Sequence, residues 1–398
     1  MTKITDIPAI RFNGFSDTWE QRKVTEIGKI YIGLVTTMTK HYTDEGTLLI
    51  RNSDIKDGKF EFGDNPIYLE KTFAEKNETR MHQIGDVITV HTGDVGTSAV
   101  ITENEAKSIG FATIVTRPNP KIIDSNYLCS FLNTDKHKKW AVSISTGDGR
   151  TNYNLGDYFE LVVPVPSIAE QKKIASYIQK LNRLITLHQR KYDKLTNVKK
   201  SMLEKMFPQN GSNVPEIRFK GFTEAWEQRK VSELFRVTRG YVLAATQTET
   251  TKTDEKPYPV YSSQTKDKGL MGYYKDYLYE DAITWTTDGA NAGTVNYRAG
   301  KFYCTNVCGV LLSNEVKANQ MIAEALNSVA KGYVSYVGNP KLMNNVMADI
   351  VIQIPTQAEE REQLSSFFAK LDNLITLHQR ELEKLKNLKK ACLEKMFV

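Results

Sequence analysis

The stretch LITLHQR at residues 184–190 occurs a second time, unchanged, at residues 374–380. The likeness extends outward, because residues 180–207 match residues 370–397 at 19 of 28 positions. The first copy lies in a run from Ile168 to Met206 that contains neither Gly nor Pro. Such a run predicts one helix of roughly 58 Å, at about 1.5 Å per residue. A rod of this length cannot be buried inside one small globule.

Both copies carry a heptad pattern, with apolar residues at alternating steps of four and three. The seam residues are Ile174, Ile178, Leu181, Ile185, His188 and Leu195 in the first copy, and Leu364, Phe368, Leu371, Ile375, His378 and Leu385 in the second. The simplest partner for one seam is the other, so we expect an intramolecular coiled coil. Docking of each seam on another protein is the alternative.

Each seam also holds a histidine at its middle and a lysine near its end. His188 and His378 have no second metal-ligating residue one helical turn away, so we interpret them as polar residues that set the register of the pair. Lys199 and Lys389 are expected to reach solvent or to meet an acidic partner. On that basis, leucine at both positions is predicted to stabilise the helix pair.

A second repeat lies upstream of each predicted helix. Residues 8–24 match residues 215–231 at 12 of 17 positions, and both copies contain WEQRKV. The repeats enclose two dissimilar inserts, residues 25–166 and 232–356. In each insert, short β-rich runs alternate with Gly, Asn and Asp turns, and a helical stretch follows near 126–140 and 319–330. The expected fold class is therefore α+β, with two different inserts carried by duplicated flanking segments.

Four segments follow from this organisation. They are a first domain at 1–166, a central repeat helix at 167–208, a second domain at 209–356 and a C-terminal repeat helix at 357–398. A length of 398 residues with 40% hydrophobic content supports packed cores in two domains of ordinary size.

Composition excludes several classes of protein. No apolar run approaches the ~20 residues that cross a bilayer, and the N-terminus has no signal-peptide pattern, so we expect a cytoplasmic protein. The four cysteines lack zinc-site spacing. Ten basic and three acidic residues at 168–206 give that helix a charge of +7, although the whole chain carries +6. Such an excess is usual on a solvated helix face, and it also suits contact with phosphates.

Two glycine-rich turns follow predicted strands, at residues 92–97 and 287–294. Neither has the Lys or the glycine spacing of a nucleotide-binding loop, so each is interpreted as a tight turn. Around them lie side chains that suit base edges and phosphates. The candidates are Lys40, His41, Arg51, Asn52, Thr92, Arg150 and Asn152 in the first insert, and Ser263, Gln264, Thr287, Asp288, Asn291, Tyr336 and Lys341 in the second. No catalytic set and no metal site are evident.

With these features assembled, the chain resembles the specificity subunit of type I restriction-modification enzymes over essentially its full length. The resemblance rests on WEQRKV at 19–24 with its copy at 226–231, on VPVPSIAEQ at 163–171, and on the helix exits that end in LEKMF. The second helix entry departs from the pattern, since it reads IPTQAEER at 354–361.

The resemblance implies a non-catalytic chain in which each insert reads one half of an asymmetric bipartite DNA site. It also implies that the two helices form an antiparallel coiled coil that fixes the spacer, and that the repeats bind two methyltransferase subunits. Those partners would carry S-adenosylmethionine, and joining restriction subunits would use ATP and Mg. Three alternatives remain: a self-contained enzyme such as a nuclease, a coiled-coil scaffold, and a DNA-binding protein without a restriction-modification role.

Overall fold

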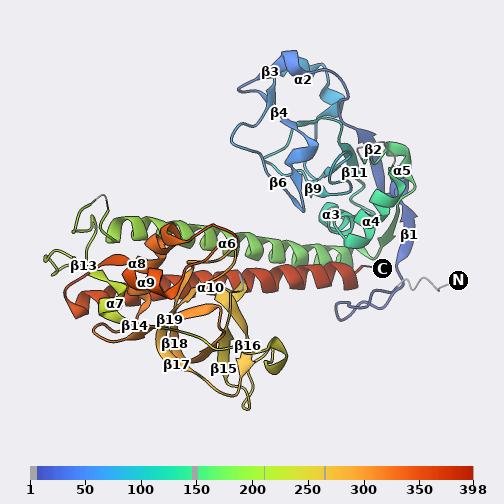
Figure 1. The fold of residues 1–398 in the computed structure, drawn as a ribbon. Helices are drawn as coiled ribbons and strands as arrows, with labels where there is room; N and C mark the ends of the chain where they lie inside the picture. Colours follow the sequence, from blue (N-terminus) through green and yellow to red (C-terminus); the bar gives the residue numbers. More distant parts are fainter. Residues whose placement is uncertain (1–6, 146–150, 210, 264–265, 398) are drawn as a thin grey trace. The chain divides into compact units, whose positions relative to one another are not determined.

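The computed structural model describes residues 7–145, 151–209, 211–263 and 266–397. The chain divides into two compact units, residues 1–189 with 380–398, and residues 190–379. Two long helices, α6 (Ile168–Met206) and α10 (Ala358–Lys395), each contribute one half to each unit. Figure 1 shows α6 in green and α10 in red.

Within each unit, the start of one long helix packs against the end of the other. In the first unit, Ile174 and Ile178 share a core with Cys392 and Leu393. In the second unit, Met206 shares a core with Leu364, Phe368 and Leu371. The paired segments therefore run antiparallel in both units, as expected for an antiparallel coiled coil. Both helices follow the predicted Gly- and Pro-free runs closely.

The first unit combines small sheets with short helices. A four-stranded antiparallel sheet has the order β2-β11-β8-β9, and a second has the order β10-β4-β7-β3. Its strands are β1 Glu20–Lys23, β2 Gly28–Ile32, β3 Tyr42–Thr43, β4 Thr47–Ile50, β5 Ile55–Lys56, β6 Lys59–Phe60, β7 Tyr68–Leu69, β8 Val87–Thr89, β9 Ser98–Val100, β10 Ile109–Gly110, β11 Ile114–Pro118 and β12 Val162–Val165. Its shorter helices are α1 Val24–Ile27, α2 Lys71–Glu75, α3 Ser125–Leu132, α4 Asp135–Ile144 and α5 Leu155–Phe159.

The second unit is built on one six-stranded sheet of order β14-β19-β17-β18-β15-β16, in which β15 and β18 are parallel. Its strands are β13 Glu227–Lys230, β14 Phe235–Arg239, β15 Tyr258–Tyr261, β16 Leu270–Tyr274, β17 Tyr279–Thr286, β18 Val295–Cys304, β19 Cys308–Ser313 and β20 Val351–Ile354. Its shorter helices are α7 Val231–Leu234, α8 Gln320–Val329 and α9 Asn344–Asp349. The two units thus carry different sheets, in keeping with their dissimilar inserts.

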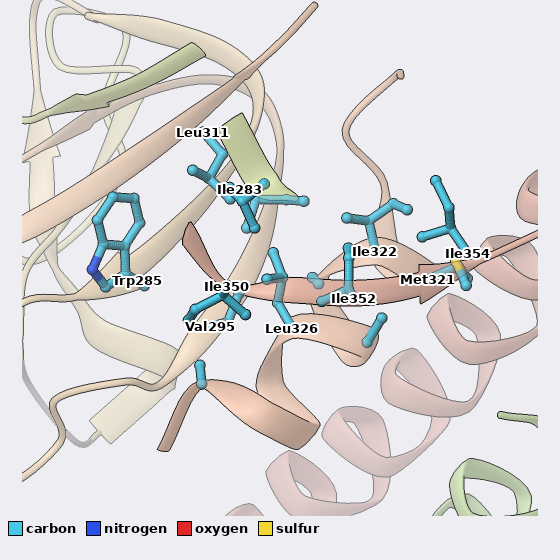
Figure 2. Packing of buried hydrophobic residues seen from close by; sticks show 14 of the residues in the cluster. Ile283, Trp285, Val295, Leu311, Met321, Ile322, Leu326, Ile350, Ile352 and Ile354 are labelled. Atoms are coloured by element: carbon cyan, nitrogen blue, oxygen red, sulfur yellow. The ribbon is translucent and has the colours of Figure 1, made fainter. Parts of the chain in front are cut away.

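The core of the second unit lies between this sheet and α8. Figure 2 shows Ile283 and Leu311 on adjacent strands, with Ile322 and Leu326 of α8 nearby. Ile352 of β20 belongs to the same core and is 3% exposed. Full burial of each such side chain stabilises the fold by about 1.5 to 3 kcal/mol. Because Ile322 and Leu326 lie one helical turn apart, they share the face of α8 that packs in this core.

The upstream repeats form matching structures. Each EQRK segment is a strand that pairs with the proline-containing strand before a long helix, β1 with β12 and β13 with β20. Trp19 and Trp226 are both buried at 3% exposure. Arg218 donates two hydrogen bonds to Glu360 at 2.7 Å, and Arg11 bonds Glu170 in the same way at 2.7 and 2.8 Å. Both glutamates are 1% exposed, so each arginine neutralises a buried charge at a helix start.

One predicted helix is in fact two. The expected helical stretch at 126–140 is interrupted between α3 and α4, because Thr134 caps α4 by accepting a hydrogen bond from His137 N at 3.1 Å. Asn133 ends α3 as its C-cap, with its backbone N–H bonded to Cys129 O at 3.1 Å, and its side-chain amide donates to Ser98 O at 2.8 Å. Threonine and asparagine favour such caps over helix interiors, which accounts for the break.

Both seam lysines meet acids within their own unit. Lys199 Nζ lies 2.6 Å from Glu324 Oε1 and 2.6 Å from Asp372 Oδ1. Lys389 Nζ lies 2.8 Å from Asp57 Oδ2 and is buried at 9% exposure, so it does not reach far into solvent. Burial alone would lower the pKa of Lys199, but the two carboxylates outweigh it and raise that pKa.

Candidate nucleic-acid interface

Three predicted DNA-contacting residues of the first unit come together from distant segments. Thr92 Oγ1 donates to Asn152 Oδ1 at 2.8 Å. The Asn52 side chain accepts from the backbone N–H of His91 at 2.8 Å and donates to Ala112 O at 3.2 Å. Asn52, Thr92 and Asn152 are therefore held in one polar cluster, which we call the Asn52 cluster.

His91 belongs to this cluster, although sequence reasoning did not single it out. Its Nδ1 lies 2.7 Å from Thr92 Oγ1. Because Thr92 Oγ1 donates its proton to Asn152, the ring nitrogen donates to Thr92, which leaves Nε2 as an acceptor in the neutral ring. Burial lowers the pKa of His91, so the neutral form is favoured.

The other predicted residues of the first unit are bonded elsewhere. Arg51 donates to both oxygens of Asp54 at 3.1 and 2.9 Å, which occupies its guanidinium. His41 lies in a short 3₁₀ helix, Thr39–His41, where its Nδ1 is 3.0 Å from Glu70 Oε2 and its ring stacks on Phe73 at 4.1 Å. Its neighbour Lys40 is exposed. Nothing in these bonds joins the three residues to the Asn52 cluster.

The turn at 92–97 requires glycine. Gly96 has φ +83°, and a Cβ built there would lie 3.1 Å from the ring of His137. His137 is buried beneath the turn, where its Nδ1 lies 2.6 Å from Leu132 O and its Nε2 lies 3.3 Å from Tyr153 OH. The tight-turn interpretation of this motif therefore has a geometric basis.

Acid is expected to destabilise the first unit through two buried histidines. Burial lowers the pKa of His82 and of His137 from 6.5 to about 4. Above pH 6.5 each of these histidines is neutral in both the folded and the unfolded chain. As the pH falls towards 4, the unfolded chain binds protons that the folded chain does not. The folded state should lose about 3 kcal/mol per histidine across that window. Urea unfolding at pH 7, 5.5 and 4.5, compared with the His137→Gln variant, measures this loss, and equal pH dependence in both proteins would contradict it.

In the second unit, loops that are distant in sequence meet around the turn at 305–307. Thr287 N donates to Val307 O at 3.0 Å, and the Arg239 guanidinium donates to Asn306 O at 3.0 Å. Thr305 Oγ1 lies 3.0 Å from Ser262 Oγ. These bonds bring together the ends of β14, β15 and β17, and we call the assembled surface the loop cluster.

Five of the predicted residues belong to the loop cluster, namely Ser263, Thr287, Asp288, Asn291 and Lys341. Asn291 donates to the backbone oxygen of Ser263 at 3.1 Å. Asp288 accepts from Thr287 Oγ1 at 2.7 Å and lies 3.8 Å from Lys341 Nζ. Thr287 is 3% exposed, so its hydroxyl orients Asp288 and is shielded from outside contact.

Tyr336 is 70% exposed in the loop that ends at Lys341. Arg150 and Gln264 lie outside the described residues. Sequence reasoning did not single out His91 and Arg239 as members of these clusters, because no motif marks residues that only the folding of separate loops brings together.

The described residues form no metal-ligand group and no membrane-spanning helix. No group of three His, Cys, Asp or Glu side chains within them could hold a metal ion. Cys304 and Cys308 are buried free thiols, and burial raises the pKa of Cys308 to about 11. Among the described residues, no helix is long and apolar enough to span a bilayer.

Comparison with known proteins assigns the chain to a family. A family model described as the type I restriction modification DNA specificity domain matches residues 16–197 and 223–387. These matches cover most of the chain and include most of each long helix. The chain therefore belongs to the type I restriction-modification specificity family.

Individual relatives agree with this membership. A Mycoplasma pneumoniae protein named as the N-terminus of a provisionally assigned type I specificity subunit is 37% identical over 131 residues, which is 32% of this chain and 68% of the relative. Two further relatives from that organism are matched over 42% and 41% of their lengths. A Methanocaldococcus jannaschii chain, provisionally assigned as a type I restriction enzyme specificity subunit, is 22% identical and is matched over 98% of this chain and 93% of its own length.

A solved structure shares the fold. The S subunit of a type I restriction-modification system from M. genitalium superimposes with a TM-score of 0.69 at 15% identity, covering 98% of this chain and 99% of the other. At that identity the likeness shows the arrangement of sheets and long helices, and nothing finer.

Proposed function

We propose that this chain is the DNA-recognition subunit of a type I restriction-modification complex and reads an asymmetric bipartite site. The observation that supports the proposal is that duplicated strands and long helices carry two dissimilar inserts. The repeated strands and long helices recur in both units, whereas the first unit presents the Asn52 cluster and the second presents the loop cluster. Two unlike surfaces on equivalent supports suit two unlike half-sites.

The proposed division of labour follows the four segments expected from the sequence. Residues 1–166 and 209–356 read DNA, while residues 167–208 and 357–398 hold the two readers and fix the spacer. Apart from the shielded Thr287, the candidates placed in the two clusters supply hydrogen-bonding groups that suit base edges. Lys40 and Lys341 supply charges that suit phosphates. The cytoplasm is the proposed location.

Catalysis is proposed to reside in partner subunits. Equivalent surfaces on the two repeats suit two copies of one methyltransferase subunit, because matching docking faces bind identical partners. S-adenosylmethionine would be held by those subunits, and ATP and Mg by restriction subunits that join through them. The chain itself is proposed to be non-catalytic.

Base-resolution mapping of methylated adenines tests this proposal. In cells that carry the chain with its methyltransferase, we expect a motif of two short specific blocks separated by a fixed unspecific gap. Cells that lack the chain serve as the control and should lose the motif. One continuous block, or a motif that persists without the chain, would refute the proposal.

A further inference from the structure

A closed hairpin projects from the loop cluster of the second unit. Ser335 and Lys341 form its neck, since Ser335 N donates to Lys341 O at 2.8 Å and Lys341 N donates to Ser335 O at 2.9 Å. The flanking residues Val334 and Leu342 are buried at 8% and 0% exposure. Trp285 Nε1 also donates to Leu342 O at 3.0 Å. The hairpin is therefore anchored on both sides and presents its tip on a stable base.

The tip of this hairpin is apolar and uncovered. Val337 is 93% exposed, and no large apolar side chain among the described residues is more exposed; its neighbour Tyr336 is 70% exposed. A second loop of the cluster adds Tyr241 and Val242, at 63% and 78% exposure, and Tyr241 N is bonded to Cys304 O. Single exposed apolar residues are common, but four on two anchored loops of the same cluster indicate a contact surface.

Polar and basic groups belong to the loop cluster from which the hairpin projects or precede its neck in the chain. Asp288 and Asn291 lie in the adjoining turn, whose Gly289 N donates to Pro340 O at 2.9 Å. Arg239, Lys331 and Lys341 are exposed. Three cations against the one carboxylate of Asp288 make this face basic, which suits a nucleic-acid backbone better than a purely apolar protein groove.

We propose that the hairpin at 335–341 is a specificity element in which Tyr336 and Val337 contact bases of the half-site that the second unit reads. This inference rests on the proposed DNA-recognition function. Tyrosine offers an apolar ring with a hydroxyl at its rim, and valine suits the thymine methyl group or an unstacked base step. Lys331 and Lys341 hold the flanking phosphates.

The test uses the full chain with its co-expressed methyltransferase, and duplexes that the wild type selects from a random-sequence library. Changing Tyr336→Ser together with Val337→Thr should weaken binding about 10- to 100-fold. Because an apolar contact releases no counterions, the slope of log affinity against log salt should stay unchanged. Reselection with the variant should relax base preference in one half of the motif alone.

Two further variants serve as a control for affinity and as a test of the salt dependence. Val351→Thr makes the same change on β20, outside the loop cluster, and should bind as the wild type does. Lys341→Ala should lower the salt slope by about one. Circular dichroism of all variants should match the wild type, because the altered side chains are exposed.

Unchanged affinity and base preference in the double variant would overturn the inference while leaving the proposed function standing. So would a loss that appears only as a reduced salt slope. If the wild-type complex selects no duplex at all, the proposed function itself fails, and this inference fails with it.

Discussion

Replacing Lys199 with leucine is expected to destabilise the second unit by about 3 kcal/mol. The reason is the pair of carboxylates that Lys199 neutralises. Glu324 and Asp372 have side-chain exposures of 8% and 14%, and each lies 2.6 Å from Lys199 Nζ. Without the ammonium group, two partly dehydrated negative charges would face each other. The Gln320 amide, which bonds Glu324 at 2.7 Å and Asp372 at 3.1 Å, and the half-exposed Lys268, 3.4 Å from Asp372, would remain beside them. Chemical denaturation of the full chain, followed by tryptophan fluorescence, measures the loss.

The matched variant is Lys389→Leu in the first unit. Its partner Asp57 is 46% exposed and can return to water, so a smaller loss is expected. The residue that corresponds to Asp372 there is Asn182, since 372 minus the repeat offset of 190 is 182, and it bears no charge. Adding Glu324→Gln and Asp372→Asn to Lys199→Leu should recover most of the stability. A Lys199→Leu protein as stable as the wild type would refute the electrostatic explanation.

The same lysines show where sequence reasoning reaches its limit. Helix periodicity depends on neighbours three and four residues away, so both long helices and their seams could be predicted from sequence. The partners Asp57 and Glu324 come from inserts more than a hundred residues away along the chain. Leucine at both seam lysines is expected from the sequence to stabilise the helix pair, whereas the two carboxylates beside Lys199 lead us to expect the opposite at that position.

Sequence reasoning likewise predicted part of the candidate interface and not the rest. Asn52, Thr92 and Asn152 were predicted from residue type and a turn signal, and the structure brings them together. Arg51 was chosen for its guanidinium, but Asp54, three residues later, engages that group in a short local turn. Val337 is apolar, so its residue type did not mark it as a candidate DNA contact. Its proposed role depends on the closed neck formed by Ser335 and Lys341. Tertiary bonds between loops decide the positions of the Asn52 cluster and of Val337, and no local pattern encodes them. The Arg51–Asp54 pair is local, and residue type alone did not reveal it.

Exchanging residues 25–166 for the equivalent block of a relative is expected to change one half of the methylated motif completely. Specific sites are typically bound about 10³-fold or more tightly than unspecific DNA, so loss of one reader should abolish methylation at the original site. The other half of the motif should persist, because the loop cluster is built from residues of the second unit alone. The reciprocal exchange of residues 232–356 should alter the opposite half.

Adenine methylation mapped across the genome, in cells that carry each exchanged chain, tests most directly the claim that each unit reads its half-site independently. We predict two hybrid motifs, each with one inherited half, one new half and an unchanged gap between them. A motif in which both halves change after a single exchange, or neither does, would contradict the account.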